Sequence, residues 1–400
     1  MLEEEEEWES ESELDDDTTP EQARKGRDIQ GIPWHEVRFT RERYRETRLL
    51  NYHNYVNRED EVDRNVLAKQ SKRFKKGGQY YAFQLNTRKV RCTIVHFQLR
   101  NLVWATSKHD VYIMHNSTVL HWNAVSRRAT EVLNLDRPRE VGRVQISTMC
   151  VHRNLLVAGG FSGELVAKDL NRKELMYSTR ITHDDSAITN AVEIFDMPGG
   201  GTRVLASNND SVVRCFDAGT FACLNRFRYQ WAVNYAVPSP DRKLLAVVGD
   251  SPEGILADFS TGKSVATLEG HQDFSFAVAW HPDGNLFATG NQDTTTRVWD
   301  VRNTKEAITV LQGRMGAVRA LRFSPDGKFL AMAEPADFVH LFNLKENCNR
   351  CQEIDLFGEV AGISFSPDSE AFFIGTEDLT YGSLLEFDRF HADRDDYYFP

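Results

Sequence analysis

The sequence predicts an all-β fold, a seven-bladed β-propeller with a partly disordered N-terminal arm. Four proline-aspartate turns recur at intervals of 42, 43 and 42 residues: Pro240-Asp241, Pro282-Asp283, Pro325-Asp326 and Pro367-Asp368. A repeat of roughly 40–45 residues is the length of one four-stranded propeller blade. Seven apolar runs end at successive distances of 46, 48, 41, 42, 43 and 45 residues, and their last residues are Asn123, Asp169, Asp217, Asp258, Asp300, Asn343 and Asp388. Seven such ends predict seven blades.

Residues 270–300 form the clearest repeat. The segment opens with Gly270-His271, turns at Pro282-Asp283-Gly284 and ends with Trp299-Asp300. Its apolar runs are short and rich in Val, Phe and Trp, which is typical of strands joined by tight turns. This unit resembles a WD40 repeat, whose signatures are the Gly-His opening and the Trp-Asp ending.

Further stretches, among them DIQGIPW, FATGNQD, RVWDVRN and MAEPADFVH, resemble a plant and fungal group of WD40 (transducin-like) proteins. The resemblance covers nearly all of residues 28–388. It implies a stiff ring that presents its loops to protein partners and that performs no chemistry of its own.

We expect four segments along the chain. Residues 1–27 form a disordered acidic tail, residues 28–78 a basic and aromatic arm that is partly helical, residues 79–390 the seven-bladed propeller, and residues 391–400 a C-terminal tail. Residues 79–86 contain a strand-like run before the first repeat. We expect this run to be the closing strand of the last blade, because closing the ring removes exposed sheet edges.

The net charge of −11 is unevenly distributed. Residues 1–21 carry twelve acids and no bases, whereas residues 22–91 carry 18 Lys and Arg against eight Asp and Glu. The chain lacks an 18-residue apolar run and a signal-peptide pattern at its start, so we expect no membrane contact and no secretion. Its six cysteines are expected to be reduced, as in a cytoplasmic or nuclear protein. We expect a monomer.

The arm has two interpretations. A charged helix is expected from about Thr40, as its N-cap, to Tyr55. The apolar residues around it, such as Trp34 and Phe39, either dock another protein or pack against the side of the propeller.

Two further features of the N-terminal region suggest regulation. Ser10 and Ser12 each precede an acid by three residues, a context that acid-directed kinases prefer. A basic cluster resembles a nuclear localisation signal or a phosphate-contacting patch, and it contains Lys69, Lys72, Arg73, Lys75 and Lys76. Because the ring is mildly acidic, a broad nucleic-acid face is not expected.

A possible hydrogen-bonded tetrad lies in the clearest repeat. His271, Thr289, Asp293 and Trp299 fall at the positions where WD40 repeats place a chain running from carboxylate to imidazole to hydroxyl to indole. Such a chain satisfies buried polar groups, so we interpret it as structural and assign no catalytic residue. The third repeat keeps a partial version in His183, Ser207 and Asp210.

Asp300 and Arg302 have a second interpretation. A repeat that ends in Trp-Asp-x-Arg resembles the box of substrate receptors of cullin-4 ubiquitin ligases, which implies contact between Arg302 and the DDB1 adaptor. The alternative is that Arg302 begins an exposed loop. The pair Cys348-x-x-Cys351 has metal-ligand spacing, but a structural zinc site needs four ligands and no second pair exists. We therefore assign neither a metal nor a cofactor.

The expected partner face carries acidic turns. In WD40 propellers the top face is built from turns between the second and third strands of each blade. Here those turns contain Glu253, Glu334 and Glu377, which would suit a basic peptide. The leading hypothesis is a non-enzymatic scaffold that binds proteins through this face and the arm. The alternatives are a cullin-4 substrate receptor and a nucleic-acid or chromatin factor that uses the basic residues of 22–91.

Overall fold

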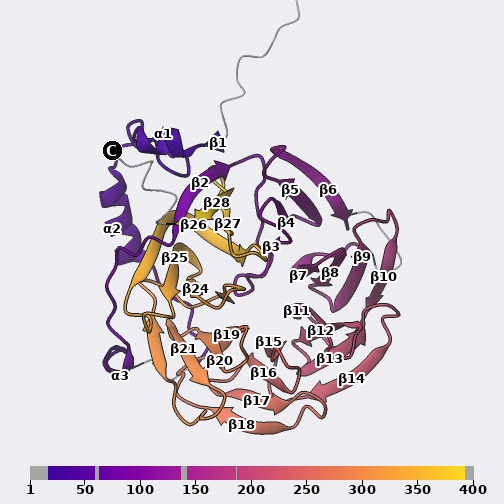
Figure 1. The fold of residues 1–400 in the computed structure, drawn as a ribbon. Helices are drawn as coiled ribbons and strands as arrows, with labels where there is room; N and C mark the ends of the chain where they lie inside the picture. The colour runs from indigo at the N-terminus through magenta and orange to yellow at the C-terminus, as the bar shows by residue number, and fades with distance from the viewer. Residues whose placement is uncertain (1–16, 59–62, 137–141, 186, 392–400) are drawn as a thin grey trace, which may run out of the picture.

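The computed structural model describes residues 17–58, 63–136, 142–185 and 187–391. The strands form six antiparallel sheets arranged as a ring (Figure 1). The all-β prediction is therefore confirmed. No helix in these described ranges is long and apolar enough to span a bilayer. Ser10 and Ser12 lie outside the described residues.

Five of the sheets have four strands each and follow one another along the chain. Their strands are β3 Val103–Ala105, β4 Asp110–His115, β5 Thr118–Asn123 and β6 Arg128–Asn134; β7 Ile146–His152, β8 Leu155–Gly160, β9 Glu164–Asp169 and β10 Leu175–Arg180; β11 Thr189–Asp196, β12 Thr202–Asn208, β13 Val212–Asp217 and β14 Cys223–Arg228; β15 Val233–Pro238, β16 Leu244–Gly249, β17 Gly254–Asp258 and β18 Ser264–Leu268; and β19 Ser275–Trp280, β20 Leu286–Asn291, β21 Thr295–Asp300 and β22 Thr309–Gln312.

The remaining sheet has eight strands. In spatial order they are β1 Asp17–Thr18, β2 Tyr81–Thr87, β28 Ser383–Arg389, β27 Ala371–Glu377, β26 Cys351–Phe365, β25 Ala336–Asn343, β24 Phe329–Ala333 and β23 Ala320–Phe323. Residues 351–355 of β26 pair with β25, and residues 360–365 pair with β27. Because one long strand joins the last two groups of strands, the count of seven blades stays a prediction. Strand β2 pairs with β28, which brings Tyr81 beside Arg389.

The inner strands of each sheet are mostly buried, whereas the outermost strands β6, β10, β14 and β18 are more exposed. Every residue of β19 and almost every residue of β20 and β21 is buried, whereas β14 and β18 are mostly exposed. Each sheet packs against both of its neighbours in the ring, so both faces of an inner strand lie in the core. This explains why the inner strands are continuous apolar runs and do not alternate apolar with polar residues.

A bulge in the innermost strand links neighbouring sheets. The register shifts between Ile146 and Thr148, and equivalent shifts occur in β11, β15, β19 and β26. Three of the extra residues donate a side-chain hydrogen bond to a carbonyl of the next sheet. These bonds are Ser147 Oγ to Thr189 O at 2.6 Å, Asn190 Nδ2 to Val233 O at 3.0 Å and Asn234 Nδ2 to Ser275 O at 3.1 Å. The bulges therefore connect the sheets around the ring axis.

The prediction of a disordered tail is wrong for residues 17–27. Strand β1 pairs with β2, and helix α1 (Pro20–Arg24) begins with a capping box between Thr19 and Gln22. Asp17 is buried, and Lys89 approaches its carboxylate to 3.4 Å. Local capping and this neutralising cation stabilise a segment whose composition alone predicts disorder.

Helices α2 (Arg41–Asn51) and α3 (Arg64–Gln70) belong to the arm, which runs along one side of the ring (Figure 1). Thr40 caps α2 by accepting a hydrogen bond from the Arg43 amide, as predicted. The helix ends at Asn51, four residues before the expected end, because Tyr52 is extended. The indole of Trp34 lies 5.1 Å from the ring of Phe357, so the arm packs on the propeller.

Glu386 provides a test of pH dependence. This buried residue of β28 has a pKa raised to about 7, first by burial and then by Asp388. In the unfolded chain its pKa returns to the ordinary value near 4.5. The stability contributed by protonated Glu386 is therefore present below about pH 4.5 and is lost as the pH rises through 7.

We expect Glu386→Gln to be more stable than the wild type by about 3 kcal/mol at pH 8, with the difference vanishing near pH 4. Urea denaturation across this range measures it. Glu306→Gln, a substitution at an exposed position, is the control. An advantage of Glu386→Gln that is the same at pH 4 and pH 8 would contradict the assignment.

Candidate protein-interaction face

One face of the ring carries the turns between the second and third strands of each sheet, and we call it the top face. It includes residues 161–163, 250–253, 292–294, 334–335 and 378–382. The arm covers part of this face.

Three arginines on one side of α2 attach the arm to the eight-stranded sheet. Arg41, Arg45 and Arg48 are spaced four and three residues apart, which places them on the same side of a helix. Arg41 Nη2 and Arg45 Nη2 donate to Asp355 Oδ1 at 2.7 and 2.8 Å, and Arg45 Nη1 donates to Asp337 Oδ2 at 2.6 Å. The guanidinium of Arg45 also lies 4.1 Å from the centre of the Phe357 ring.

Asp337 is the central acceptor of this attachment. It is 0% exposed, and its φ of 72° places it in the left-handed region. Arg48 donates to both of its oxygens, and the Gly358 amide donates to Oδ1 at 3.1 Å. A buried carboxylate therefore holds two arginines of the arm.

Beyond α2 the arm crosses the top face. Tyr52 lies over Gly316, where an added side chain would approach the tyrosine hydroxyl to 3.0 Å. Gln292 Nε2 donates to the Tyr55 carbonyl at 2.8 Å, and Asn54 Oδ1 accepts from the Ala317 amide at 3.0 Å. The arm thus forms part of the face that was expected to receive a partner.

An aromatic cluster is exposed where the arm crosses the top face after α2. Tyr55 of the arm is 57% exposed, and its ring lies 5.2 Å from that of Phe97, which is 51% exposed. The His96 ring stacks on Phe97 at 5.1 Å, and Phe161 lies 6.1 Å from His96. Arm and propeller therefore contribute to one aromatic surface on the top face.

An acidic pocket lies on the same face, over the eight-stranded sheet. Its volume is about 370 Å³, and it is lined by Arg48, Gly358, Glu359, Glu377, Asp378 and Leu379. Burial raises the pKa of Glu377, and the neighbouring Glu359 adds to this effect. One of the three predicted glutamates, Glu377, is therefore part of a real concavity. Glu253 is exposed on another turn, after β16.

The prediction that Glu334 contacts a partner is wrong. This carboxylate is fully buried, and it accepts hydrogen bonds from the backbone amides of Arg314, Met315 and Gly316. His340 Nε2 lies 2.7 Å from Glu334 Oε1, the oxygen that also accepts from the Arg314 amide. Glu334 therefore shapes the loop before β23 and is not accessible from solvent.

The four predicted tetrad residues meet inside the fifth sheet. His271 Nδ1 lies 3.0 Å from Asp293 Oδ2, and His271 Nε2 lies 2.9 Å from Thr289 Oγ1. Trp299 Nε1 donates to the same hydroxyl at 2.9 Å. Although burial opposes it, the pKa of Asp293 is lowered by His271 and by hydrogen bonds from Thr295 and Gln272. Every residue of this chain of bonds is buried, as a structural role requires.

The partial version in the third sheet does not form. His183 is exposed, and Ser207 Oγ has no hydrogen-bond partner among the described residues. Asp210 instead pairs with Arg214 at 2.5 Å. Without the histidine, the arginine becomes the partner of the turn carboxylate.

The remaining predicted residues lie apart from the top-face surface. Arg302 is exposed at the end of β21, and its Nε donates to Asp300 Oδ1 at 2.9 Å. Cys348 and Cys351 are buried as free thiols, and no cluster of three or more metal ligands occurs in the described ranges.

The basic cluster runs along the outside of the ring. Lys69, Arg73, Lys75 and Lys76 are exposed, whereas Lys72 donates to the Asn347 carbonyl. Its role in nuclear localisation or phosphate contact stays a prediction.

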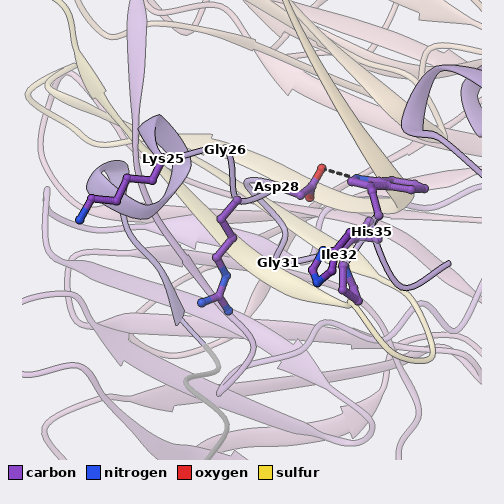
Figure 2. A pocket seen from close by; sticks show the side chains of 9 residues that line it. Lys25, Gly26, Asp28, Gly31, Ile32 and His35 are labelled. Carbon is purple, nitrogen blue, oxygen red and sulfur yellow. Dashed lines mark hydrogen bonds between the residues drawn. The ribbon is translucent and has the colours of Figure 1, made fainter.

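A second pocket lies within the arm (Figure 2). Its volume is about 620 Å³, and its lining residues are Lys25, Gly26, Arg27, Asp28, Gly31, Ile32, Pro33, Trp34 and His35. The indole N–H of Trp34 donates to Asp28 at 2.9 Å across it, and the Lys25 ammonium pairs with Glu21 at 2.7 Å. These bonds define the turn of the arm after α1.

Two features of the sequence could have indicated this face, although the amino-acid composition does not show them. The spacing of Arg41, Arg45 and Arg48 places three cations on one side of the helix that Thr40 caps. Their acceptors lie about 300 residues away along the chain, so the sequence does not identify them. Phe97 and Phe161 occur singly in loops, where an isolated aromatic residue is not part of a recognisable sequence pattern.

Comparisons with known proteins agree with this architecture. A family model described as WD domain, G-beta repeat, matches residues 262–300 and 305–335. A chain in the crystal structure of the mitotic checkpoint complex superposes with a TM-score of 0.64 at 16% identity, covering 76% of this chain and 94% of that one. At this identity the superposition shows the fold alone.

Three curated relatives match part of the sequence. The nuclear distribution protein PAC1 of Coccidioides posadasii is 27% identical over 38% of this chain and 36% of its own length. The target of rapamycin complex subunit wat1 of Schizosaccharomyces pombe is 33% identical over 38% of this chain and 48% of its own. The nuclear distribution protein nudF of Aspergillus niger is 25% identical over 41% and 42%. The chain spans less than half the length of each relative. Together with the ring of sheets, these matches show that the chain contains WD40 repeats and has a propeller fold.

Proposed function

We propose that this protein is a non-enzymatic scaffold that binds protein partners on its top face, on a surface built jointly by the propeller and the arm. The observation that carries the proposal is the exposed aromatic cluster of Tyr55, Phe97 and Phe161. Aromatic side chains dominate the energetics of protein interfaces, because they bury a large area at a small entropic cost.

The charge around this cluster indicates the chemistry of the partner. Asp184, Asp185, Glu253 and Asp378 are exposed on the loops of the top face, and Glu359 is exposed within β26. An acidic rim around an aromatic centre suits a segment in which an apolar side chain is flanked by Lys or Arg. The acidic pocket beside Glu377 would receive one of these cations.

A comparative purification tests the proposal. Wild type, Phe97→Ala and Val125→Ala are used as baits in parallel, and recovered proteins are quantified by mass spectrometry. Val125 is also an exposed apolar residue, but it lies in the turn before β6. We expect partners that are lost with Phe97→Ala and retained with Val125→Ala, and we expect purified partners to bind directly with roughly tenfold weaker affinity to Phe97→Ala. Equal recovery by all three baits would refute the top-face proposal.

The second candidate function is that of a substrate receptor for a DDB1–cullin-4 ubiquitin ligase. It is favoured by the exposure of Arg302, which Asp300 holds in an ordered position away from the top face. Arg302→Ala in the same purification separates the two functions. Loss of adaptor and cullin subunits with this variant alone would support the receptor, and their absence from every bait would rule it out.

A further inference from the structure

Arg319 is a buried cation that has no ion-pair partner in the part of the chain that the structure describes. It directly precedes β23, the strand beside β24 at one edge of the eight-stranded sheet, and it is 4% exposed. Its guanidinium lies 4.3 Å from the centre of the Phe276 ring, and Nη2 donates to Gln292 Oε1. Its Nε and Nη1 have no hydrogen-bond partner among the described residues.

The surrounding charges do not compensate this cation. Arg100 is equally buried and adds a second positive charge, but its Nη2 has a carboxylate partner, Glu359, at 2.8 Å. The carboxylate of Asp273 acts to raise the pKa of Arg319, yet its oxygens accept from the amides of Phe274 and Asn57. Burial of a guanidinium with two donor atoms that have no partner among the described residues is unfavourable, which makes Arg319 a candidate ligand-binding residue.

The neighbouring titratable groups report the same excess of positive charge. The pKa of Arg319 is lowered to about 9, first by burial and then by Arg100. The pKa of His96 is also lowered, by burial and by the charges of Arg100 and Arg319. At Tyr52 of the arm, burial raises the pKa to about 12, while the charges of Arg319 and Arg100 act to lower it.

We propose that Arg319 binds a small oxyanion of the phosphate type near the ring axis, beneath the arm. Phosphate oxygens accept hydrogen bonds from arginine N–H groups, and Nε and Nη1 of Arg319 are the donor atoms without a partner among the described residues. The arm would cover the ion, because Gln292 bonds both to Arg319 and to the Tyr55 carbonyl of the arm. Binding requires a small movement of the surrounding side chains, since the two free donors are shielded from solvent.

Calorimetry and thermal unfolding with potassium phosphate test the site, with potassium chloride at equal ionic strength as reference. We expect saturable phosphate binding and a saturable rise in melting temperature for the wild type. Arg319→Gln should bind phosphate ~10-fold or more weakly. Arg128→Gln, which removes an exposed arginine of β6, should behave as the wild type.

A second measurement uses the wild type alone, so its result does not depend on whether Arg319→Gln folds. Bound phosphate adds negative charge beside Arg319, so the pKa of His96 followed by NMR should rise when phosphate replaces chloride. A phosphoserine peptide is tested in a second experiment. Competition between peptide and phosphate would identify a phosphorylated ligand as the source of the ion, and phosphate binding alone would identify the free ion. An unchanged His96 titration, or a non-saturating effect that Arg319→Gln shares, would mean an adventitious ion only and would overturn the proposal.

Discussion

Replacing Asp337 by asparagine is expected to lower the free energy of unfolding by about 3 kcal/mol and to loosen α2 from the ring. Asparagine tolerates the left-handed backbone at this position, so the change removes the charge without adding backbone strain. It leaves Arg45 and Arg48 against a neutral group, and uncompensated buried charges of this kind cost ~3–5 kcal/mol. The loss should lie near the lower end, because Asp355 still pairs with Arg45.

Two measurements separate the loss of stability from the release of the arm. Urea denaturation gives the stability, and limited trypsin digestion reports access to Arg41, Arg45 and Arg48. Asp185→Asn is the control, since Asp185 is exposed. Resistance of α2 to trypsin in Asp337→Asn, equal to that of the wild type, would show that the arm is held by other contacts.

Replacing Asp293 by alanine is expected to destabilise the fifth sheet by roughly 3–4 kcal/mol. The carboxylate accepts from His271 Nδ1, from the amides of Gln272 and Thr295, and from the Thr295 hydroxyl at 2.6 Å. These donors are buried, and each one left unsatisfied costs ~1–3 kcal/mol before the structure relaxes. Trp299→Phe removes only the last bond of the chain and should cost less, about 1–3 kcal/mol.

Thermal unfolding of Asp293→Ala, Trp299→Phe and the exposed control Asp185→Ala should therefore rank in that order, with the control unchanged. A Trp299→Phe variant as stable as the wild type would mean that the indole bond contributes nothing. If Asp293→Ala also matched the control, the tetrad would not stabilise this sheet.

The strands and turns were predictable because their signals are local. The proline-aspartate spacing marks the turn before the second strand in four consecutive repeats, and β16, β20, β24 and β27 follow these turns. Thr40 was recognised as a helix cap from its neighbours alone, and the four tetrad residues were found because the repeat itself sets their spacing.

Side-chain burial was not predictable in the same way. Glu334 and Glu377 occupy equivalent acidic turns in the sequence, yet Glu334 is buried against three backbone amides and Glu377 lines an open pocket. The difference depends on how the neighbouring loop folds over each turn. Asp17 shows the same limit, since its acidic surroundings predicted disorder and Lys89 from a distant segment neutralises it.

The sequence by itself determined that this chain is a repeat propeller, where its turns lie and that the fifth repeat carries a buried polar chain. These properties depend on residues close together along the chain and on a period that recurs along the sequence. Only the tertiary structure decided that the arm belongs to the top face. The bond between Arg45 and Asp337 joins residues 292 positions apart. No local pattern specifies which buried carboxylate a given arginine will reach, because that choice is made by the closed ring that brings them together.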